Sequence, residues 1–379
     1  KEALADLAAA IDLEPGDATA YHQRGLTLLA IGDPEAAVVD LDQAAELYEA
    51  DPEKAQAYHD RGHAHRAQGD LEAAIADYER AIQLSPDTTP DGGGRAAAKA
   101  RAWESRGLAL AEQEDLDGAI ADHTQAISLD PEYAGAYHSR GLAHAAQGDL
   151  GSAVDDLTQA TTIDPAFAAA YHSRGLARTA QGDRAGAIAD FDRAIAVDSQ
   201  YAEAFHSRGL AQRDQGDLEA AVADVTRAIA LFPDGAAYAL KRATAYHDRG
   251  LARRDGGNLE GALADLSEAI NLLPEGAAFV GASAAIHAVA KAAVHQDRGL
   301  LRAARGELEA AVADYTAAIA LLPAGRAVAE SYCFRGLALS DLGDLAAAVA
   351  DFDQAILLLP DDETHSVDRA EICLHRGLA

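Results

Sequence analysis

The chain has 379 residues, a formal net charge of −31, 49% hydrophobic residues and only 5% aromatic residues. So much negative charge repels phosphate groups, which argues against nucleic acid and anionic membranes as partners. No run of 18 apolar residues occurs, so membrane insertion is not expected.

The two cysteines, Cys333 and Cys373, make no disulfide framework and are expected to be buried thiols. The chain starts at Lys1 and holds no methionine, from which we expect a processed chain or a window on a longer one.

We expect repeats of two helices, called helix A and helix B in chain order. The chain should begin with an unpaired helix B half-repeat over 1–16, continue with nine A–B repeats over 17–366 and end with an unpaired helix A half-repeat over 367–379. An Arg-Gly pair recurs at ten equivalent points of the pattern, and its glycine returns after 34 residues from Gly107 to Gly141 and again to Gly175. A period of this length predicts one all-α solenoid of stacked helix pairs.

Some repeats carry insertions. The one around Pro90–Gly94 is rich in glycine and predicts a flexible loop. The one within Ala277–Val294 is unusually apolar, so we expect it to lengthen a helix A and to bury its apolar side against another chain or repeat.

The unit Ala134–Phe167 shows the pattern without insertions. Apolar residues follow the 3.6-residue period on both sides of Gly148-Asp149. Gly148 suits the left-handed position after a helix, Asp149 suits an N-cap, and Pro165 cannot continue the second helix. Each unit is therefore predicted to be a helix A, a tight turn and a helix B.

This unit resembles the tetratricopeptide repeat (TPR) family through the following residues: Tyr137, Gly141, Ala153, Leu157, Ala160 and Pro165. The resemblance implies a right-handed superhelical solenoid of about ten TPR-like repeats that binds proteins. Two positions depart from the family: the seventh, usually Leu, is Arg in every copy, and the eleventh, usually aromatic, is Leu, His, Gln or Arg. We therefore expect helix A to pack differently there. His123 stands where the family prefers an aromatic residue, so a core histidine is expected.

The repeated Arg is matched by a repeated Asp on helix B, which predicts a structural ladder of Arg–Asp pairs. The alternative is a row of arginines that binds a ligand. The clearest members of the ladder are these: Arg140, Asp156, Arg174, Asp190, Arg208 and Asp224.

Six histidines recur at the fifth position, which the family resemblance places in the concave groove: His22, His59, His138, His172, His206 and His247. Neighbouring copies stand about one helix diameter apart, roughly 10 Å, which is too far for two to share a zinc ion. Hydrogen bonding or packing between repeats is the preferred interpretation, with metal binding or pH sensing as alternatives. No metal or cofactor is expected.

No catalytic motif occurs, so an enzyme is not expected. The lysines and asparagines with which some TPR proteins clamp a carboxylate are absent around His138 and His172. The groove looks neutral and apolar there, which favours a protein partner over an acidic tail.

Two functions remain. The preferred hypothesis is a structural subunit that stacks head to tail into a filament, because both ends expose uncapped half-repeats. The alternatives are a scaffold that binds proteins or peptides in its groove, or a segment of a longer TPR protein. A filament implies an extracellular or cell-surface location, and a scaffold a cytoplasmic one. The expected inter-subunit residues, with Arg376 near Asp6 of the neighbouring copy, are Leu4, Asp6, Leu7, Ile372, Leu374, Arg376 and Leu378.

Overall fold

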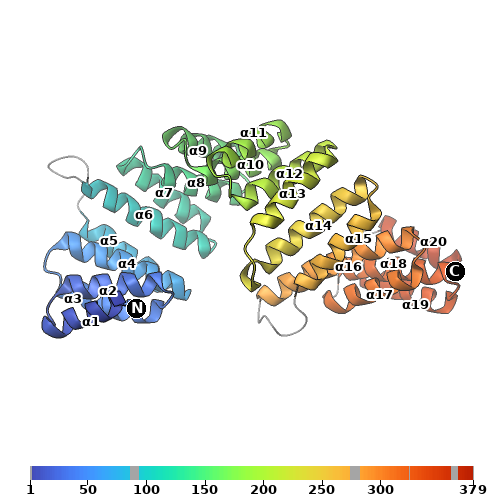
Figure 1. Ribbon diagram of the computed structural model, residues 1–379, viewed down its shortest axis with the longest axis horizontal. Helices are drawn as coiled ribbons and strands as arrows, with labels where there is room; N and C mark the ends of the chain where they lie inside the picture. Colours follow the sequence, from blue (N-terminus) through green and yellow to red (C-terminus); the bar gives the residue numbers. More distant parts are fainter. Residues whose placement is uncertain (1, 86–93, 274–281, 324, 360–365, 379) are drawn as a thin grey trace. The chain divides into compact units, whose positions relative to one another are not determined.

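A computed structural model of the protein describes residues 2–85, 94–273, 282–323, 325–359 and 366–378, in which all regular structure is helical (Figure 1). Lys1–Asp198 and Ser199–Ala379 form two compact units, called unit 1 and unit 2 below. No helix among the described residues is long and apolar enough to cross a membrane.

Unit 1 contains α1 (Glu2–Leu13), α2 (Ala18–Ala30), α3 (Pro34–Leu47), α4 (Asp51–Gln68), α5 (Leu71–Leu84), α6 (Gly94–Glu112), α7 (Leu116–Leu129), α8 (Ala134–Ala146), α9 (Leu150–Ile163), α10 (Ala168–Gln181) and α11 (Arg184–Val197). Unit 2 contains α12 (Ala202–Gln215), α13 (Leu218–Leu231), the short η1 (Ala236–Tyr238), α14 (Ala239–Asp255), α15 (Leu259–Leu272), α16 (Ala282–Ala304), α17 (Leu308–Leu321), α18 (Arg326–Asp341), α19 (Leu345–Leu358) and α20 (Ser366–Leu378).

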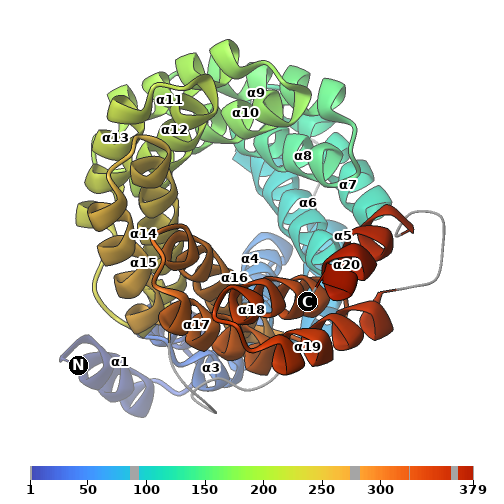
Figure 2. The ribbon, with the colours of Figure 1, turned by 90° about the vertical axis from the view of Figure 1, so that its right-hand side faces the viewer.

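Successive helices pair antiparallel as helix–turn–helix repeats, from α2 with α3 to α18 with α19, and α1 and α20 lie at the two ends of the series. In unit 1, Figure 2 shows α6, α8 and α10 on the inner side of the stack and α7, α9 and α11 on the outer side. The inner helices carry the Arg-Gly pairs, so the inner side of unit 1 is formed by the A helices.

The turn inside each repeat forms for the reasons that the sequence suggested. Gly148 has φ +84°, the left-handed conformation that glycine adopts without steric cost. Asp149 caps α9, because its Oδ1 accepts a hydrogen bond of 3.1 Å from the backbone N–H of Ser152. The same turn brings helix A and helix B into close contact at the Arg-Gly pair.

That contact explains the repeated glycine. A Cβ atom on Gly141 would lie 2.9 Å from Cγ of Leu157, and one on Gly175 would lie 2.5 Å from Cε1 of Phe191. Leu157 and Phe191 are almost fully buried. The glycine therefore makes room for the large residue that helix B places in the core.

The insertions lengthen the A helices where the structure describes them. α16 has 23 residues, compared with 13 in α8, and its Ala292 and Val294 are buried. Ile286 and Val289, nearer its start, are 57% and 47% exposed, so the expected burial covers only part of the helix. Residues 277–281, and the expected loop except for its last residue, lie outside the described residues.

The expectation that both cysteines are buried was wrong for Cys373, which is exposed on α20, while Cys333 on α18 is half-buried. Ile372 was expected to point outward from the end of the chain, and this was also wrong. It is only 6% exposed, because it packs in one cluster with Phe352 and Leu359 of the preceding repeat.

Candidate functional site

The repeated Arg of helix A forms a two-pronged contact with the Asp sixteen residues later. Arg140 donates from Nε and Nη2 to the two carboxylate oxygens of Asp156, each at 2.7 Å. The same contact joins Arg24–Asp40, Arg61–Asp77, Arg106–Asp122, Arg174–Asp190, Arg208–Asp224, Arg249–Asp265, Arg298–Asp314 and Arg335–Asp351. The hydrogen bond to Asp156 raises the pKa of Arg140, although burial opposes it.

The third nitrogen of the same arginines reaches the preceding repeat. Arg140 Nη1 donates to the hydroxyl of Thr124 on α7 at 3.1 Å, and Arg174 Nη1 donates to Thr158 on α9 at 3.2 Å. The guanidinium of Arg140 also lies over the ring of Tyr137, 5.7 Å from its centre, in a cation–π contact. One arginine thus joins its own helix B to the previous one, which leaves little of it for a ligand.

Several of these aspartates bind a second cation that was not predicted from the sequence. Arg178 Nη1 donates to Asp190 at 2.7 Å, and Arg253 makes the equivalent contact with Asp265 at 2.8 Å. These arginines stand at the eleventh position, where the chain departs from the family pattern. The signal was present, because an Arg at this position lies twelve residues before the repeated Asp.

Most of the fifth-position histidines form hydrogen bonds to the A helix of the next repeat. His22 Nε2 lies 2.8 Å from Asp60 Oδ2, and His138 Nε2 lies 3.0 Å from the hydroxyl of Ser173. The same connection joins His59–Ser105, His206–Asp248 and His247–Asp297. His172 packs against the ring of Phe191. Among the described residues, no group of three or more His, Cys, Asp or Glu is arranged to hold a metal ion.

Burial and hydrogen bonding shift the pKa values of the side chains in these contacts between repeats. Burial lowers the pKa of His138 to about 4, so this imidazole is neutral near pH 7. Burial alone would raise the pKa of Asp60, but hydrogen bonds from His22, His59 and Gln56 lower it below its usual range. Asp60 therefore stays ionised between two A helices.

An apolar row runs beside the histidines on the inner side of unit 1. Leu142 on α8 and Leu176 on α10 directly follow the Arg-Gly pairs and are 43% and 47% exposed. Each stands one helical turn from the histidine of its own repeat, on the same helix face. The neighbouring inner positions are uncharged: Ala145, Ala146, Thr179 and Ala180. This surface suits aliphatic side chains of another molecule.

An open hollow lies on the inner side between α4 and α6, lined by His63, Arg66, Ala67 and Glu112. Arg66 donates from Nε and Nη2 to Glu112 Oε1, at 2.9 and 2.6 Å. Burial raises the pKa of Glu104, although Arg66 and the hydrogen bond of Ser139 act against it. Arg66 thus bonds to Glu112, and its charge also acts on Glu104.

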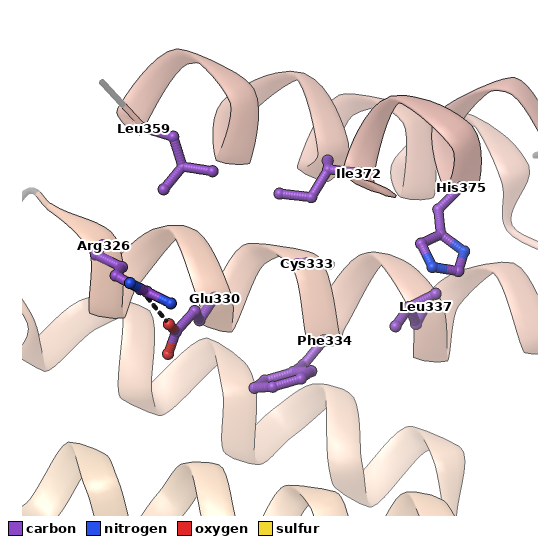
Figure 3. Close-up of a pocket in the computed structure, with 8 residues that line it drawn as sticks. All are labelled: Arg326, Glu330, Cys333, Phe334, Leu337, Leu359, Ile372 and His375. Atoms are coloured by element: carbon purple, nitrogen blue, oxygen red, sulfur yellow. Dashed lines mark hydrogen bonds and ion pairs between the residues drawn. The ribbon is translucent and has the colours of Figure 1, made fainter. Parts of the chain in front are cut away.

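In unit 2, a pocket of about 200 Å³ lies between α18 and α20 (Figure 3). Its eight lining residues are Arg326, Glu330, Cys333, Phe334, Leu337, Leu359, Ile372 and His375. Figure 3 shows Ile372 and His375 directed from α20 towards α18. Cys333 occupies the place that the histidines hold in earlier repeats, and its short side chain leaves space there.

The residues expected at an inter-subunit joint lie on α1 and α20. Leu374 and Leu378 are 61% and 77% exposed, and Asp6 is also exposed, whereas Leu4 and Leu7 are half-buried. Arg376 donates from Nη1 to Asp353 of the preceding repeat at 2.7 Å, as the internal arginines do.

The sequence matches the tetratricopeptide repeat family over residues 55–88, over 18–51 and 329–362, and over 138–202, 172–236 and 206–277, and it matches a TPR repeat over 107–148. The chain therefore belongs to the TPR family, whose members mediate protein–protein interactions.

A solved structure of a TPR protein is similar in fold to this chain. A tetratricopeptide repeat protein from Parabacteroides merdae ATCC 43184 is 17% identical, with a TM-score of 0.51, over 75% of this chain and 98% of that one. PilF of Pseudomonas aeruginosa is 18% identical, with a TM-score of 0.49, over 64% and 98%. YrrB, described as a TPR protein with an unusual peptide-binding site, is 22% identical, with a TM-score of 0.39, over 53% and 97%. No curated protein matches the chain.

Proposed function

We propose that the chain is a non-catalytic scaffold that binds a segment of a partner protein on the inner side of unit 1. The observation that carries this proposal is the pair of exposed leucines, Leu142 and Leu176, which stand at matching positions of neighbouring A helices whose next inner positions are uncharged. Exposed aliphatic side chains at matching positions of successive repeats give an extended segment a continuous apolar contact.

The Arg–Asp ladder supports this function by holding the surface rigid. Arg140 and Arg174 are occupied by Asp156 and Asp190, so in our proposal they are structural and leave recognition to the inner face of the A helices. A preorganised surface loses less conformational entropy when a partner binds.

Selection of binding peptides from a random library tests the proposal. We expect the selected peptides to lose at least tenfold in affinity for the double variant Leu142→Ser/Leu176→Ser, because its inner surface is less apolar. Val39→Ser is the matched control, since Val39 is 68% exposed on α3, a B helix. Peptides that bind the double variant as tightly as the parent chain would refute the inner surface as the site.

As a second candidate we propose head-to-tail stacking of copies. Asp6 is exposed, whereas Asp156 and its equivalents are buried and bound by arginine. Arg376 donates to Asp353 through Nη1, the atom that internal arginines direct to the preceding repeat. A neighbouring copy that supplies Asp6 would therefore give Arg376 its usual second partner.

Sedimentation tests this second candidate. Asp6→Arg should abolish association, and Asp6→Arg/Arg376→Asp should restore it. A parent chain that remains monomeric at all concentrations would refute head-to-tail stacking.

A further inference from the structure

The inner surface of unit 1 has a charged hollow next to its apolar row, and the two together specify the chemistry of a partner. The hollow lies between α4 and α6, and the leucines lie on α8 and α10, so one extended segment crosses both. We infer that the partner is a basic protein segment that places two aliphatic side chains over Leu142 and Leu176 and one lysine or arginine side chain in the hollow. This inference rests on the proposed function.

The charges around the hollow favour a cation. Arg66 is the guanidinium of the hollow, and it gives both of its hydrogen bonds to one oxygen of Glu112. Glu104, two turns before Glu112 on α6 and outside the lining of the hollow, takes a hydrogen bond from the hydroxyl of Ser139 rather than from a second cation. Glu112 and Arg66 balance each other inside the hollow, and Glu104, whose charge also interacts with Arg66, adds one negative charge next to it that an added ammonium group would balance.

The protonation of nearby groups agrees with this. Burial raises the pKa of Glu104 although the hydrogen bond from Ser139 and the charge of Arg66 oppose it, and burial followed by the charge of Glu104 raises the pKa of Tyr133 to about 12. Burial lowers the pKa of His63 to about 4, so this residue adds no positive charge to the hollow near pH 7. The net charge of −31 further speeds the approach of a basic partner.

The repeat geometry sets the spacing of the partner's side chains. Neighbouring packed helices lie about 10 Å apart, and a segment in the polyproline II conformation advances about 3.1 Å per residue with three residues per turn, so side chains three residues apart face the same way. The side chains over Leu142 and Leu176 are therefore about three residues apart. The midpoint between α4 and α6 is about one and a half helix spacings from α8, which places the basic residue about five residues beyond the first aliphatic one.

A matched set of fluorescent peptides tests the inference by polarisation. The first probe consists of a lysine, four serines, a leucine, two serines and a second leucine, in that order. A second probe has the reverse order. Two further probes replace the lysine by glutamate or the leucines by serine. We expect at least one lysine probe to bind, the glutamate probes to bind about fivefold or more weakly, and the serine probes not to bind.

Variants of the protein distinguish the effect of the charge in the hollow from the effect of the net charge on peptide binding. Glu112→Gln should weaken the lysine probe about fivefold, and Arg66→Gln should strengthen it by a similar factor, because the two substitutions change the charge of the hollow in opposite directions. Glu72→Gln is the matched control, since Glu72 is exposed on α5 and its loss changes the net charge equally. Circular dichroism checks that each variant is folded.

The outcomes distinguish this inference from the proposed function. Equal binding of the lysine and glutamate probes, with loss of both in Leu142→Ser/Leu176→Ser, would leave the apolar site intact and overturn the cation site. Equal weakening by Glu112→Gln and Glu72→Gln would also overturn it, because only net charge would then matter. If no leucine probe binds the parent chain, the inferred composition and spacing of the partner are wrong, whereas the proposed function is decided by the peptides selected from the random library.

Discussion

Arg174 on α10 binds Asp190 on α11 through two hydrogen bonds, of 3.0 Å from Nε and 2.6 Å from Nη2. Asp190 is only 2% exposed, so its charge depends on this contact and on Arg178. The contact replaces the leucine that the family usually has at this position of helix A. A buried charge pair thus stands where an apolar contact is common.

Removing the arginine should therefore be costly. We expect Arg174→Ala to destabilise unit 1 by about 3 kcal/mol, because it leaves a buried carboxylate with less compensation. The triple variant Arg174→Leu/Arg178→Leu/Asp190→Leu should recover most of this loss, because it restores an apolar contact and leaves no arginine unpaired. Urea unfolding measures both. The control is Arg305→Ala, whose exposed pair with Glu307 is worth less than about 1 kcal/mol; an equally small effect at Arg174 would contradict the buried pair.

The repeated glycine gives a prediction with an internal control. Gly175→Ala should destabilise the protein by about 2 kcal/mol, because the new Cβ would lie 2.5 Å from the ring of Phe191. Gly377→Ala occupies the equivalent place on α20, where no atom lies within 4 Å, and should be neutral or stabilising by up to about 1 kcal/mol. Thermal unfolding of the two variants distinguishes them, and equal effects would contradict the close approach of the helices.

Glu114 offers a stabilising substitution. It has φ +67° at the turn after α6, where other repeats use glycine, as at Gly148. A side chain is strained in this left-handed conformation by about 1 kcal/mol. We expect Glu114→Gly to raise the free energy of unfolding by a similar amount, and Gly148→Glu to lower it. A destabilised Glu114→Gly variant would show that the glutamate makes a compensating contact.

His123 predicts a pH dependence. It is fully buried, neither ring nitrogen has a hydrogen-bond partner within the described part of the chain, and burial lowers its pKa to about 4. In the unfolded chain the pKa is about 6.5. The unfolded state therefore binds more protons between pH 6.5 and 4, and stability falls as pH falls through this range, by about 3 kcal/mol in all.

The substitution His123→Phe should remove this loss, since phenylalanine fills the same place in other repeats, as Phe191 does against Gly175. The measurement is the difference in free energy of unfolding between the two proteins at pH 7 and pH 4. We expect the difference to grow in favour of the variant as pH falls. Parallel pH profiles would show that His123 is not the group responsible.

Much of the fold could be predicted from local sequence. The turn at Gly148-Asp149 and the pairing of Arg140 with Asp156 depend on residues at fixed short separations, so a period and a helical face are enough to predict them. The core position of His123 followed in the same way.

Contacts between repeats were harder to predict. Arg66 meets Glu112 across 46 residues, and that separation includes an insertion whose length does not reveal how the next helix is placed. The hydrogen bond from His22 to Asp60 depends likewise on how two A helices stack. Ile372 was misassigned because it packs against Phe352 and Leu359 of the preceding repeat, whereas an outward direction had been assumed from its place near the end.

The Arg–Asp contact has the same sixteen-residue separation in every repeat where it occurs, whereas the distance in sequence from the arginine back to the preceding helix B varies. Arg140 reaches Thr124 across 16 residues, Arg249 reaches Thr226 across 23, and Arg298 reaches Ser267 across 31. Among the described residues the changes in length thus fall before the arginine, in the junction between repeats and in the first turns of helix A. These junctions are the natural places for engineering: a tag or a small domain placed between α9 and α10 would add length without entering any hairpin.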